Sequence, residues 1–410
     1  MDEYENKKLF LCNVFQIPPD YQIPSQFSIQ VKEILLNLIV KINKIPYLKP
    51  NSLTFMKGIG NIKLSSFYKN VTKEMQKELN DKSYNHQIYD FILPSGRQIY
   101  LYIITEKKDN RIDSSSLYNS IYVWLHFIDN ISKNKCCQLL NIYIILDQNT
   151  RQIPNHRFIP LQSKNINSGF TFTCKENNDI FIYRKEEAFK VFIHESFHSF
   201  HLDFSNMDQT MANEKIKETF QGIHGKQDLR IYEAYTEFWA EIINILLLNK
   251  NKKETLSFNF HKINECIFYE RLWSIFQCGK ILHHCNLELK NLFIKDFHHS
   301  SSSSSSSSSF GYETNTFPFS YFLLKAICFE NINDFILFCH KENNDLINFT
   351  HTTKNITTFC HLVTNIKETK TNLGLINGLD KINKWFSNGK IKSNQNYLFF
   401  LKTLRMSMYG

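Results

Sequence analysis

The sequence predicts an α+β protein in which a small mixed sheet with an edge strand is followed by a mainly helical part. Between residues 86 and 184, short runs of alternating apolar and polar residues are separated by turn residues, a pattern typical of strands. From residue 205 onward, apolar residues recur at the three-to-four spacing of helices. Hydrophobic residues make up 42% and aromatic residues 14% of the 410, which excludes a disordered chain and allows a large core.

Residues 1–85 form an N-terminal region that we expect to be helical or irregular and whose role the sequence does not reveal. The run "SIQVKEILLNLIVKINKI" at 28–45 predicts a helix, because its apolar residues recur on one face. The stretch 69–82 is polar and rich in lysine.

Residues 86–204 form the predicted α/β subdomain. "HQIYDFILPSGRQIYLYIIT" at 86–105 predicts a β-hairpin, because Pro94, Ser95 and Gly96 provide a turn between two alternating runs. The further elements expected here are a helix at 116–132, strands at 140–147, 167–174 and 180–184, and a long helix from Glu186.

Residues 205–410 form the predicted helical subdomain. We expect helices at 213–222, 229–249, 263–283, 318–329, 331–341, 379–387 and 396–406. Ten consecutive serines, Ser300 to Ser309, interrupt this part. Such a run cannot supply a packed surface, so it predicts an exposed loop and no array of catalytic serines.

The net charge of +9 is spread along the chain, with no block of five or six like charges. We therefore predict no specific nucleic-acid partner. The longest apolar stretches, 34–40 and 238–248, are shorter than the ~18–20 residues that span a bilayer, and the first 15 residues do not resemble a secretory signal. We expect no membrane partner and an intracellular, cytoplasmic location.

The ten cysteines are scattered and contain no C-x-x-C pair. This spacing predicts reduced, mostly buried thiols and no disulfide framework.

The stretch "HESFHSFH" at 194–201 raises the question of a metal site. On a helix, His194 and His198 lie about 40° apart and one turn apart, so both imidazoles can reach one ion, and Glu195 projects beside them. This is the H-E-x-x-H pattern, in which two histidines bind zinc and the glutamate acts on a water molecule. The alternative is a buried helix whose histidines are satisfied by packing. A chain of this composition would contain roughly 0.05 such matches by chance, which favours the metal site.

His201 shares this face but is rejected as the third ligand. If the helix is intact, His201 lies about 10.5 Å along the axis from His194, too far for one ion to bind both. The glycine that breaks the helix in metzincins is absent, because His201 and Phe204 occupy the positions concerned.

A second helix, within "IYEAYTEFWAEIINILLL", carries Glu233, Glu237 and Glu241 at four-residue spacing, so these side chains share one face. Buried carboxylates are costly unless they are paired or bind a metal. The alternative is a solvated stripe. Burial is favoured by the neighbours Tyr232, Tyr235, Phe238 and Trp239.

H-E-x-x-H on one helix and E-x-x-x-[D/E] on a second resemble the gluzincin zinc metallopeptidases, which have a zincin-like fold. The resemblance implies that His194, His198 and Glu233 bind Zn²⁺, that Glu195 is the catalytic base, and that Glu237 hydrogen-bonds a zinc-binding histidine. A glutamate at 237 in place of the commoner aspartate is a departure. The 34 residues between His198 and Glu233 are near the long end for the group.

The resemblance also implies the activity, a zinc-dependent endopeptidase. In gluzincins an edge strand precedes the motif helix, and an extended substrate adds to it as a further strand. We therefore expect a protein or peptide substrate near residues 166–173.

A peptidase also needs a donor for the oxyanion. Tyr321, in "FPFSYFLLKAIC", is the first candidate, against the alternative of a packed core tyrosine. His283 or His284 is the second candidate, and Arg405 the third.

The whole chain further resembles an uncharacterised group of metallopeptidase-like proteins of large DNA viruses, on the basis of "YRKEEAFKVFIHESFH" and a composition typical of AT-rich genomes. This resemblance implies a viral protein of the host cytoplasm or the virion. Two alternatives to the peptidase remain: a non-proteolytic zinc hydrolase such as a deacylase, and a catalytically silent virion or interaction protein. A peptide deformylase is disfavoured, because that family is smaller and uses an upstream cysteine as ligand. The intact Glu195 disfavours the silent protein.

Overall fold

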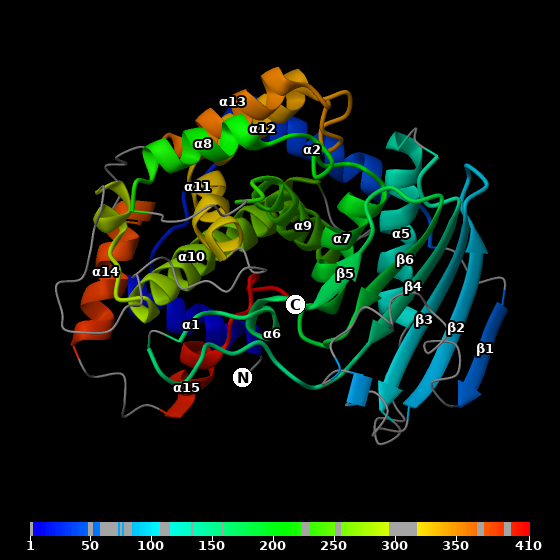
Figure 1. Cartoon of the computed structure of the whole chain (residues 1–410), viewed down its shortest axis with the longest axis horizontal. Coiled ribbons are helices and arrows are strands. Elements are labelled where there is room, and N and C mark those ends of the chain that lie inside the picture. Colours follow the sequence, from blue (N-terminus) through cyan, green and yellow to red (C-terminus); the bar gives the residue numbers. More distant parts are fainter. Residues whose placement is uncertain are drawn as a thin grey trace.

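The computed structural model describes residues 3–47, 52–57, 73, 76–77, 84–106, 115–132, 135–157, 159–222, 229–250, 256–294, 318–366, 373–388 and 395–410. The described residues form a six-stranded mixed sheet on one side and a large group of helices on the other (Figure 1). The predicted α+β class is therefore confirmed. The predicted loop at 300–309 and most of the polar stretch 69–82 lie outside the described residues.

The sheet has the strand order β1-β2-β3-β4-β6-β5. Its strands are β1 (Ser52–Lys57), β2 (Tyr84–Ile92), β3 (Gln98–Glu106), β4 (Leu139–Ile145), β5 (Gly169–Thr171) and β6 (Asn177–Ile182). β2 pairs antiparallel with both β1 and β3, the strands β3, β4 and β6 run parallel, and the short β5 pairs antiparallel with β6 at one edge. The predicted hairpin is present, with Gly96 in the left-handed region (φ 91°) that its turn requires.

The helices α5 (Ser115–Ile131) and α7 (Ala188–Ser199) lie next to each other beside the sheet (Figure 1). Trp124 of α5 is fully buried, donates to Ser196 Oγ of α7 at 2.6 Å and stacks on Phe197. Because α7 also contacts β5 and β6, it is fixed between the sheet and the helical part.

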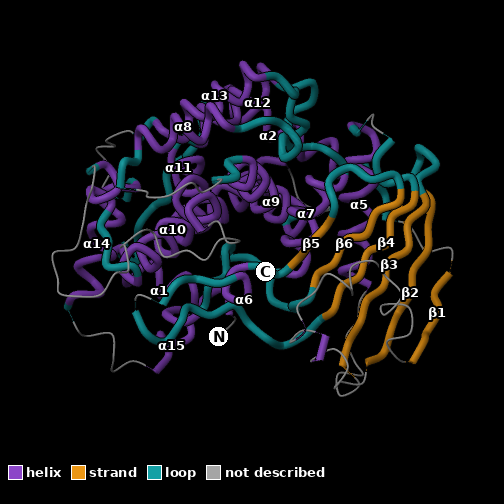
Figure 2. The backbone as a smooth tube through the Cα atoms, in the orientation of Figure 1, coloured by secondary structure: helices purple, strands orange, loops and turns teal. Residues whose placement is uncertain are grey.

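The helical part surrounds α9 (Tyr232–Leu248), which packs on α7, α10 and α11 and is buried along almost its whole length (Figure 2). The other helices are α8 (Thr210–Thr219), α10 (Leu256–His284), α11 (Lys325–Glu330), α12 (Ile332–Glu342), α13 (Thr353–Thr364), α14 (Leu375–Ser387) and α15 (Gln395–Lys402), with a four-residue α6 (Ser163–Ile166), a 3-10 turn at Leu289–Phe293 and a π-helical turn at Phe319–Leu324. No helix among the described residues is both long and apolar enough to cross a membrane.

The N-terminal region packs on the helical part. Helix α1 (Glu3–Phe15) contacts α10 and α14, and α2 (Ile29–Asn43) contacts α12 and α5. The sequence predicted α2, but neither α1 nor β1 was expected in this region.

One expectation about the cysteines is wrong. Cys136 and Cys174 form a disulfide, with their Cα atoms 4.7 Å apart. The two residues meet because the loop between β5 and β6 runs beside the start of β4, where Cys137 N–H donates to Lys175 O at 2.7 Å. The remaining eight cysteines are free, and all but the half-buried Cys12 are buried, as predicted.

Candidate metal centre

Helix α7 carries the H-E-x-x-H residues and is anchored at both ends. It begins after Glu187, which has a left-handed backbone (φ 58°) and accepts the N–H groups of Met406 and Ser407 with its carboxylate. It ends at Ser199, Phe200 is the C-cap residue, and His201 follows in the left-handed region (φ 59°). His201 was rejected as a third ligand on the assumption that the helix continues through this residue. The structure shows that the helix ends before it. His201 stacks on His351 with ring centroids 4.1 Å apart, and it is not part of the metal-ligand group described next.

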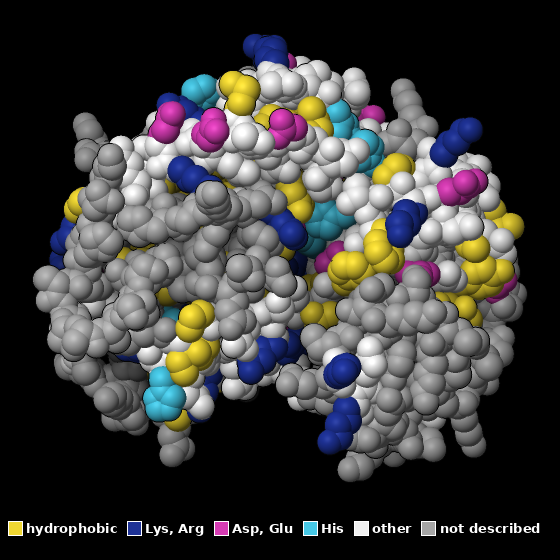
Figure 3. Space-filling model, viewed as in Figure 1, with side chains coloured by type: hydrophobic (Ala, Val, Ile, Leu, Met, Phe, Trp, Pro, Cys, Tyr) yellow, Lys and Arg dark blue, Asp and Glu magenta, His cyan; other side chains and the backbone are white. Residues whose placement is uncertain are grey.

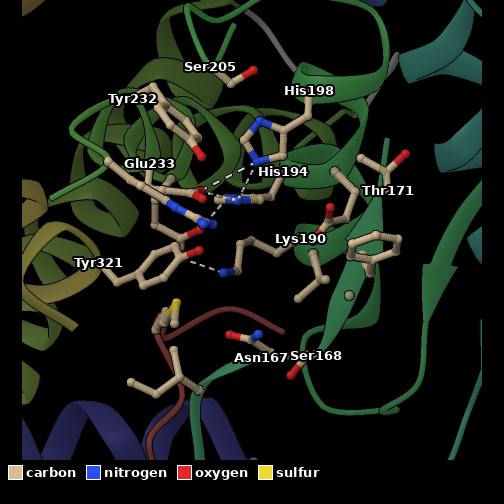
Figure 4. A pocket seen from close by; sticks show the side chains of 18 of the residues that line it. Asn167, Ser168, Thr171, Lys190, His194, His198, Ser205, Tyr232, Glu233 and Tyr321 are labelled. Carbon is tan, nitrogen blue, oxygen red and sulfur yellow. Dashed lines mark hydrogen bonds and ion pairs between the residues drawn. The ribbon is translucent and has the colours of Figure 1, made fainter. Parts of the chain in front are cut away.

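Three side chains converge between α7 and α9. Nε2 of His194 lies 3.0 Å from Oε2 of Glu233 and 3.2 Å from Nε2 of His198, and the remaining separation, from His198 Nε2 to Glu233 Oε2, is 3.4 Å. Ligand atoms that surround one ion tetrahedrally at ~2.1 Å lie about 3.4 Å from one another. The buried group formed by His194, His198 and Glu233 could therefore hold a metal ion. Figure 4 shows these three side chains pointing toward one another.

A carboxylate holds the other nitrogen of each imidazole. Nδ1 of His194 lies 2.8 Å from Oε2 of Glu237, in the position that the sequence pattern implied. Nδ1 of His198 contacts the carboxylate of Asp203, which was not predicted. These contacts fix the ring orientations and direct both Nε2 atoms to the shared centre, as is usual for metal-binding histidines.

Asp203 is fully buried and makes hydrogen bonds to α9 and to its own loop as well as its contact with His198. It accepts from Thr236 Oγ1 of α9 at 3.1 Å and from Ser205 Oγ at 2.8 Å. Helical spacing could not have identified it, because the chain turns at His201 between His198 and Asp203.

The row of glutamates on α9 is buried: Glu233, Glu237 and Glu241 are 5%, 1% and 0% exposed. The alternative of a solvated stripe is therefore wrong. The second oxygen of Glu237 pairs with Lys190 of α7, and Glu241 lies 2.6 Å from Lys325. Lys190 was also missed, although a lysine among the apolar residues of "AFKVFI" was a signal that a buried carboxylate lies nearby.

Glu195 lies on a cavity of about 260 Å³ beside the edge strand β5. The backbone of β5 passes so close that a Cβ atom on Gly169 would lie 2.8 Å from Oε1 of Glu195 and 2.8 Å from Cγ1 of Val191. The space-filling view shows histidine side chains at the surface between the helical part and the sheet, so this region is open to solvent on the face that is drawn (Figure 3).

The open side of β5 presents backbone groups to this cavity. Ser168 C=O accepts from Tyr183 N–H at 3.0 Å, so the residue preceding β5 faces β6. Because the N–H and C=O groups of alternate residues point to opposite sides of an antiparallel strand, those of Gly169 and Thr171 point away from β6. Gly169 and Thr171 both line the cavity.

Two tyrosines face the ligand group from the helical part (Figure 4). The ring of Tyr321, on the π-helical turn, lies 6.0 Å from that of His194, and the ring of Tyr232, which was not predicted, lies 5.7 Å from that of His198. Both line the cavity.

The other candidate donors from the sequence lie elsewhere. His284 contacts Ile159 C=O at 2.9 Å, His283 stacks on Phe386, and Arg405 pairs with Glu186 at 3.0 Å. None of the three lines the cavity that contains Glu195.

The charges of the group are interdependent. Burial lowers the pKa of His194, but Glu233 and Glu237 outweigh burial and raise this pKa to about 9. Burial also acts against the charged form of His198, yet Asp203 and Glu233 raise its pKa well above 6.5. Without a metal, the carboxylates therefore favour protons on the two imidazoles, and a divalent ion would compete with these protons.

Glu195 and Tyr321 are perturbed in the opposite sense. Burial raises the pKa of Glu195, although the two imidazolium ions counteract it in part. Burial and the nearby Glu233 raise the pKa of Tyr321 well above 10, so its hydroxyl keeps its proton and can donate a hydrogen bond.

Comparison of the chain with protein-family models, curated proteins and solved structures finds no match. The interpretation of this site therefore depends on its own geometry.

Proposed function

We propose that the protein is a zinc-dependent endopeptidase of the gluzincin type, with a zincin-like fold. The main support is the spacing of 3.0–3.4 Å among the Nε2 atoms of His194 and His198 and the carboxylate of Glu233. Two histidines and one glutamate are a ligand set of catalytic zinc sites, in which the fourth position is left for water or substrate.

Zn²⁺ bound there would supply a Lewis acid that lowers the pKa of water and polarises the substrate carbonyl. Glu195 would take the proton of the attacking water and pass it to the amine as the C–N bond breaks. Its raised pKa suits this exchange, because a base that must also act as an acid works best near the operating pH.

Tyr321 would donate a hydrogen bond to the oxygen that becomes negative when the carbonyl carbon turns tetrahedral. Tyr232, on the other side of the ligand group, is close enough to share this task. Glu237 and Asp203 would orient the two histidines.

An extended peptide is the substrate that the edge strand favours. The N–H and C=O groups of Gly169 and Thr171, which point away from β6, can pair with the backbone of a peptide that lies along β5. A deacylase acting on a short acyl group would not use these groups, so the open edge supports the peptidase over the deacylase.

Metal analysis and the Glu195→Gln variant test this proposal. The purified protein should contain about one zinc per chain. Glu195→Gln should retain zinc but lose at least about 100-fold of its activity on a mixture of unstructured peptides, because the base is removed and the ligands are unchanged. The exposed Glu218→Gln is the matched control and should keep full activity.

Peptide cleavage at the normal rate by Glu195→Gln would refute the assigned base. Zinc-loaded protein that hydrolyses acyl-lysine or formyl substrates but no peptide would favour the deacylase. Absence of zinc together with absence of hydrolysis would favour the silent protein.

A further inference from the structure

A second cavity, of about 610 Å³, lies in the helical part and shares no lining residue with the cavity that contains Glu195. Its walls come from the end of α1 and the loop after it, from α10, from the junction of α11 and α12, and from α14. The apolar wall residues are Phe15, Ile17, Pro18, Tyr21, Pro24, Phe268, Phe329, Ile332 and Leu373. This volume is within the range of pockets that hold small molecules, ~300–1,000 Å³.

Arg271 gives the cavity a cationic group with few partners. Its side chain is 16% exposed, and its Nη1 lies 3.5 Å from Oε2 of Glu330, at the outer limit of a hydrogen bond. Its guanidinium also lies 5.8 Å from the centre of the Phe268 ring. A guanidinium has five N–H donors, so this one long contact leaves most of its capacity for an anion.

The charges of the wall also favour an anion. Among the described residues that line the cavity, Arg271 and Lys381 are the cations and Glu330 is the one anion. Lys381 already donates one of its three N–H groups to Phe15 C=O at 3.0 Å, whereas Arg271 keeps most of its five, so Arg271 can offer a ligand more hydrogen bonds than Lys381 can.

The rest of the wall favours an apolar ligand body. Asn333 donates to Gln26 C=O at 2.8 Å and accepts from Ser28 N–H at 2.8 Å, so its amide is engaged within the protein. The side chains that remain for contact are mostly the aromatic and aliphatic ones, and these offer no partners to a peptide backbone.

We infer that this cavity binds a small aliphatic carboxylate, such as a medium-chain fatty acid. The carboxylate pairs with Arg271 in the two-pronged geometry that a guanidinium favours, and the chain lies against Phe15, Phe268 and Phe329. The site is independent of the proposed peptidase activity.

Calorimetric titration with sodium decanoate tests this inference, with decan-1-ol as the uncharged control of equal chain length. Decanoate should bind with a stoichiometry of one at this cavity and about ten- to hundred-fold more tightly than the alcohol, because a hydrogen bond to a charged group adds that much affinity.

The decisive variant is Arg271→Met/Glu330→Gln, which removes both charges and so leaves no unpaired carboxylate. It should reduce decanoate affinity to that of decan-1-ol and leave the alcohol unaffected. Leu373→Trp, which fills the cavity without touching the charges, should weaken both ligands. Because neither variant alters the metal centre, decanoate that binds there would persist in both.

The inference would be overturned if the wild type and Arg271→Met/Glu330→Gln bound decanoate with equal affinity. It would also be overturned if the wild type did not bind decanoate at 1 mM, which is roughly the weakest affinity typical of a specific ligand. Circular dichroism of each variant shows whether it is folded. If the double variant is unfolded, Leu373→Trp decides, and decanoate binding that it leaves unchanged refutes the site.

Discussion

Each imidazole of the candidate metal centre lies between two carboxylates. His194 has Glu237 at Nδ1 and Glu233 at Nε2, and His198 has Asp203 at Nδ1 and the same Glu233 at Nε2. The outer carboxylates set the ring orientations before a metal binds, so the geometry of the ligand atoms depends on residues that would not themselves touch the ion.

Asp203→Asn should lower zinc affinity by about 10- to 100-fold, because the amide cannot replace the charge that orients His198 and increases its basicity. Competition with a zinc chelator measures the affinity. Asp208→Asn is the control, because Asp208 is an exposed aspartate that accepts from the N–H and hydroxyl of Thr210 and is not among the residues that line the cavity. Unchanged affinity in Asp203→Asn would show that the contact seen here has no role in metal binding.

Metal binding should depend on pH through the two histidines. In the metal-free protein the pKa of His194 is raised to about 9, and Asp203 and Glu233 also raise the pKa of His198, so the carboxylates favour protons on both rings near neutral pH. Binding one ion there should release about two protons, and affinity should rise with pH until the rings lose their protons unaided. Calorimetry in buffers of different ionisation enthalpy counts the protons released, and a count near zero contradicts this assignment.

The same shifts determine how the metal-free fold responds to pH. A pKa raised from 6.5 to about 9 means that the ion pairs of His194 stabilise the fold fully below pH 6.5. This contribution is lost as the pH rises through about 9, the range in which metal binding becomes strongest.

At the scale of elements, the edge strand and α7 are in such close contact that only glycine fits at position 169. A methyl group there would lie 2.8 Å from both Glu195 Oε1 and Val191 Cγ1, so either the strand or the carboxylate must move.

Gly169→Ala should therefore lower kcat/KM for peptides by about 10- to 100-fold, since a displacement near 1 Å at a reacting group has effects of this size. Zinc content should stay unchanged, because the atoms nearest to the added methyl group belong to Glu195 and Val191 and not to a proposed zinc ligand. Steady-state kinetics and metal analysis together measure both effects. Glu218→Gln, which is exposed on α8 and lies outside the residues that line this cavity, is again the control, and equal kinetics for the two variants would contradict the close-contact argument.

Elements with a strong periodic pattern were predictable from the sequence. The hairpin of β2 and β3, the helix α5, and the two helices that carry His194 and Glu233 all follow from local patterns. Helix α13 was missed because its threonines and asparagine weaken the helical signal, although Thr352 caps it by accepting from Asn355 N–H.

Features that depend on contacts between distant segments were not predictable. The position of β1 at the sheet edge depends on pairing with β2 across a long connection, and the Cys136–Cys174 disulfide depends on how the sheet brings two loops together. At the metal centre, Glu237 was predictable because it lies one helical turn after Glu233. Asp203 and Lys190 were not predictable, because their contacts depend on how the chain turns after α7 and on how α7 packs against α9.

At the scale of the whole molecule, buried ion pairs join segments from distant parts of the chain. Lys325 of α11 bonds Glu241 of α9 at 2.6 Å and Met406 C=O at 2.8 Å, and Glu270 of α10 is close enough to interact electrostatically. Met406 in turn lines the cavity that contains Glu195, and its N–H donates to the carboxylate of Glu187, the residue before α7. Lys325 thus links four segments that surround the site.

Lys325→Met should lower the free energy of unfolding by about 3–5 kcal/mol, because Glu241 and Glu270 would remain buried without their cation. Burial already raises the pKa of Glu241 and Lys325 opposes this effect, so loss of the lysine should leave Glu241 protonated. The double variant Lys325→Met/Glu241→Gln should lose less stability than Lys325→Met alone, because the neutral amide avoids the cost of neutralising Glu241 inside the fold. Urea unfolding measures the free energy of unfolding of each variant. Lys341→Met is the control: the Lys341 side chain is 82% exposed, so its replacement should change stability by less than about 0.5 kcal/mol. A loss for Lys325→Met no larger than for Lys341→Met would mean that the buried pair does not stabilise the fold.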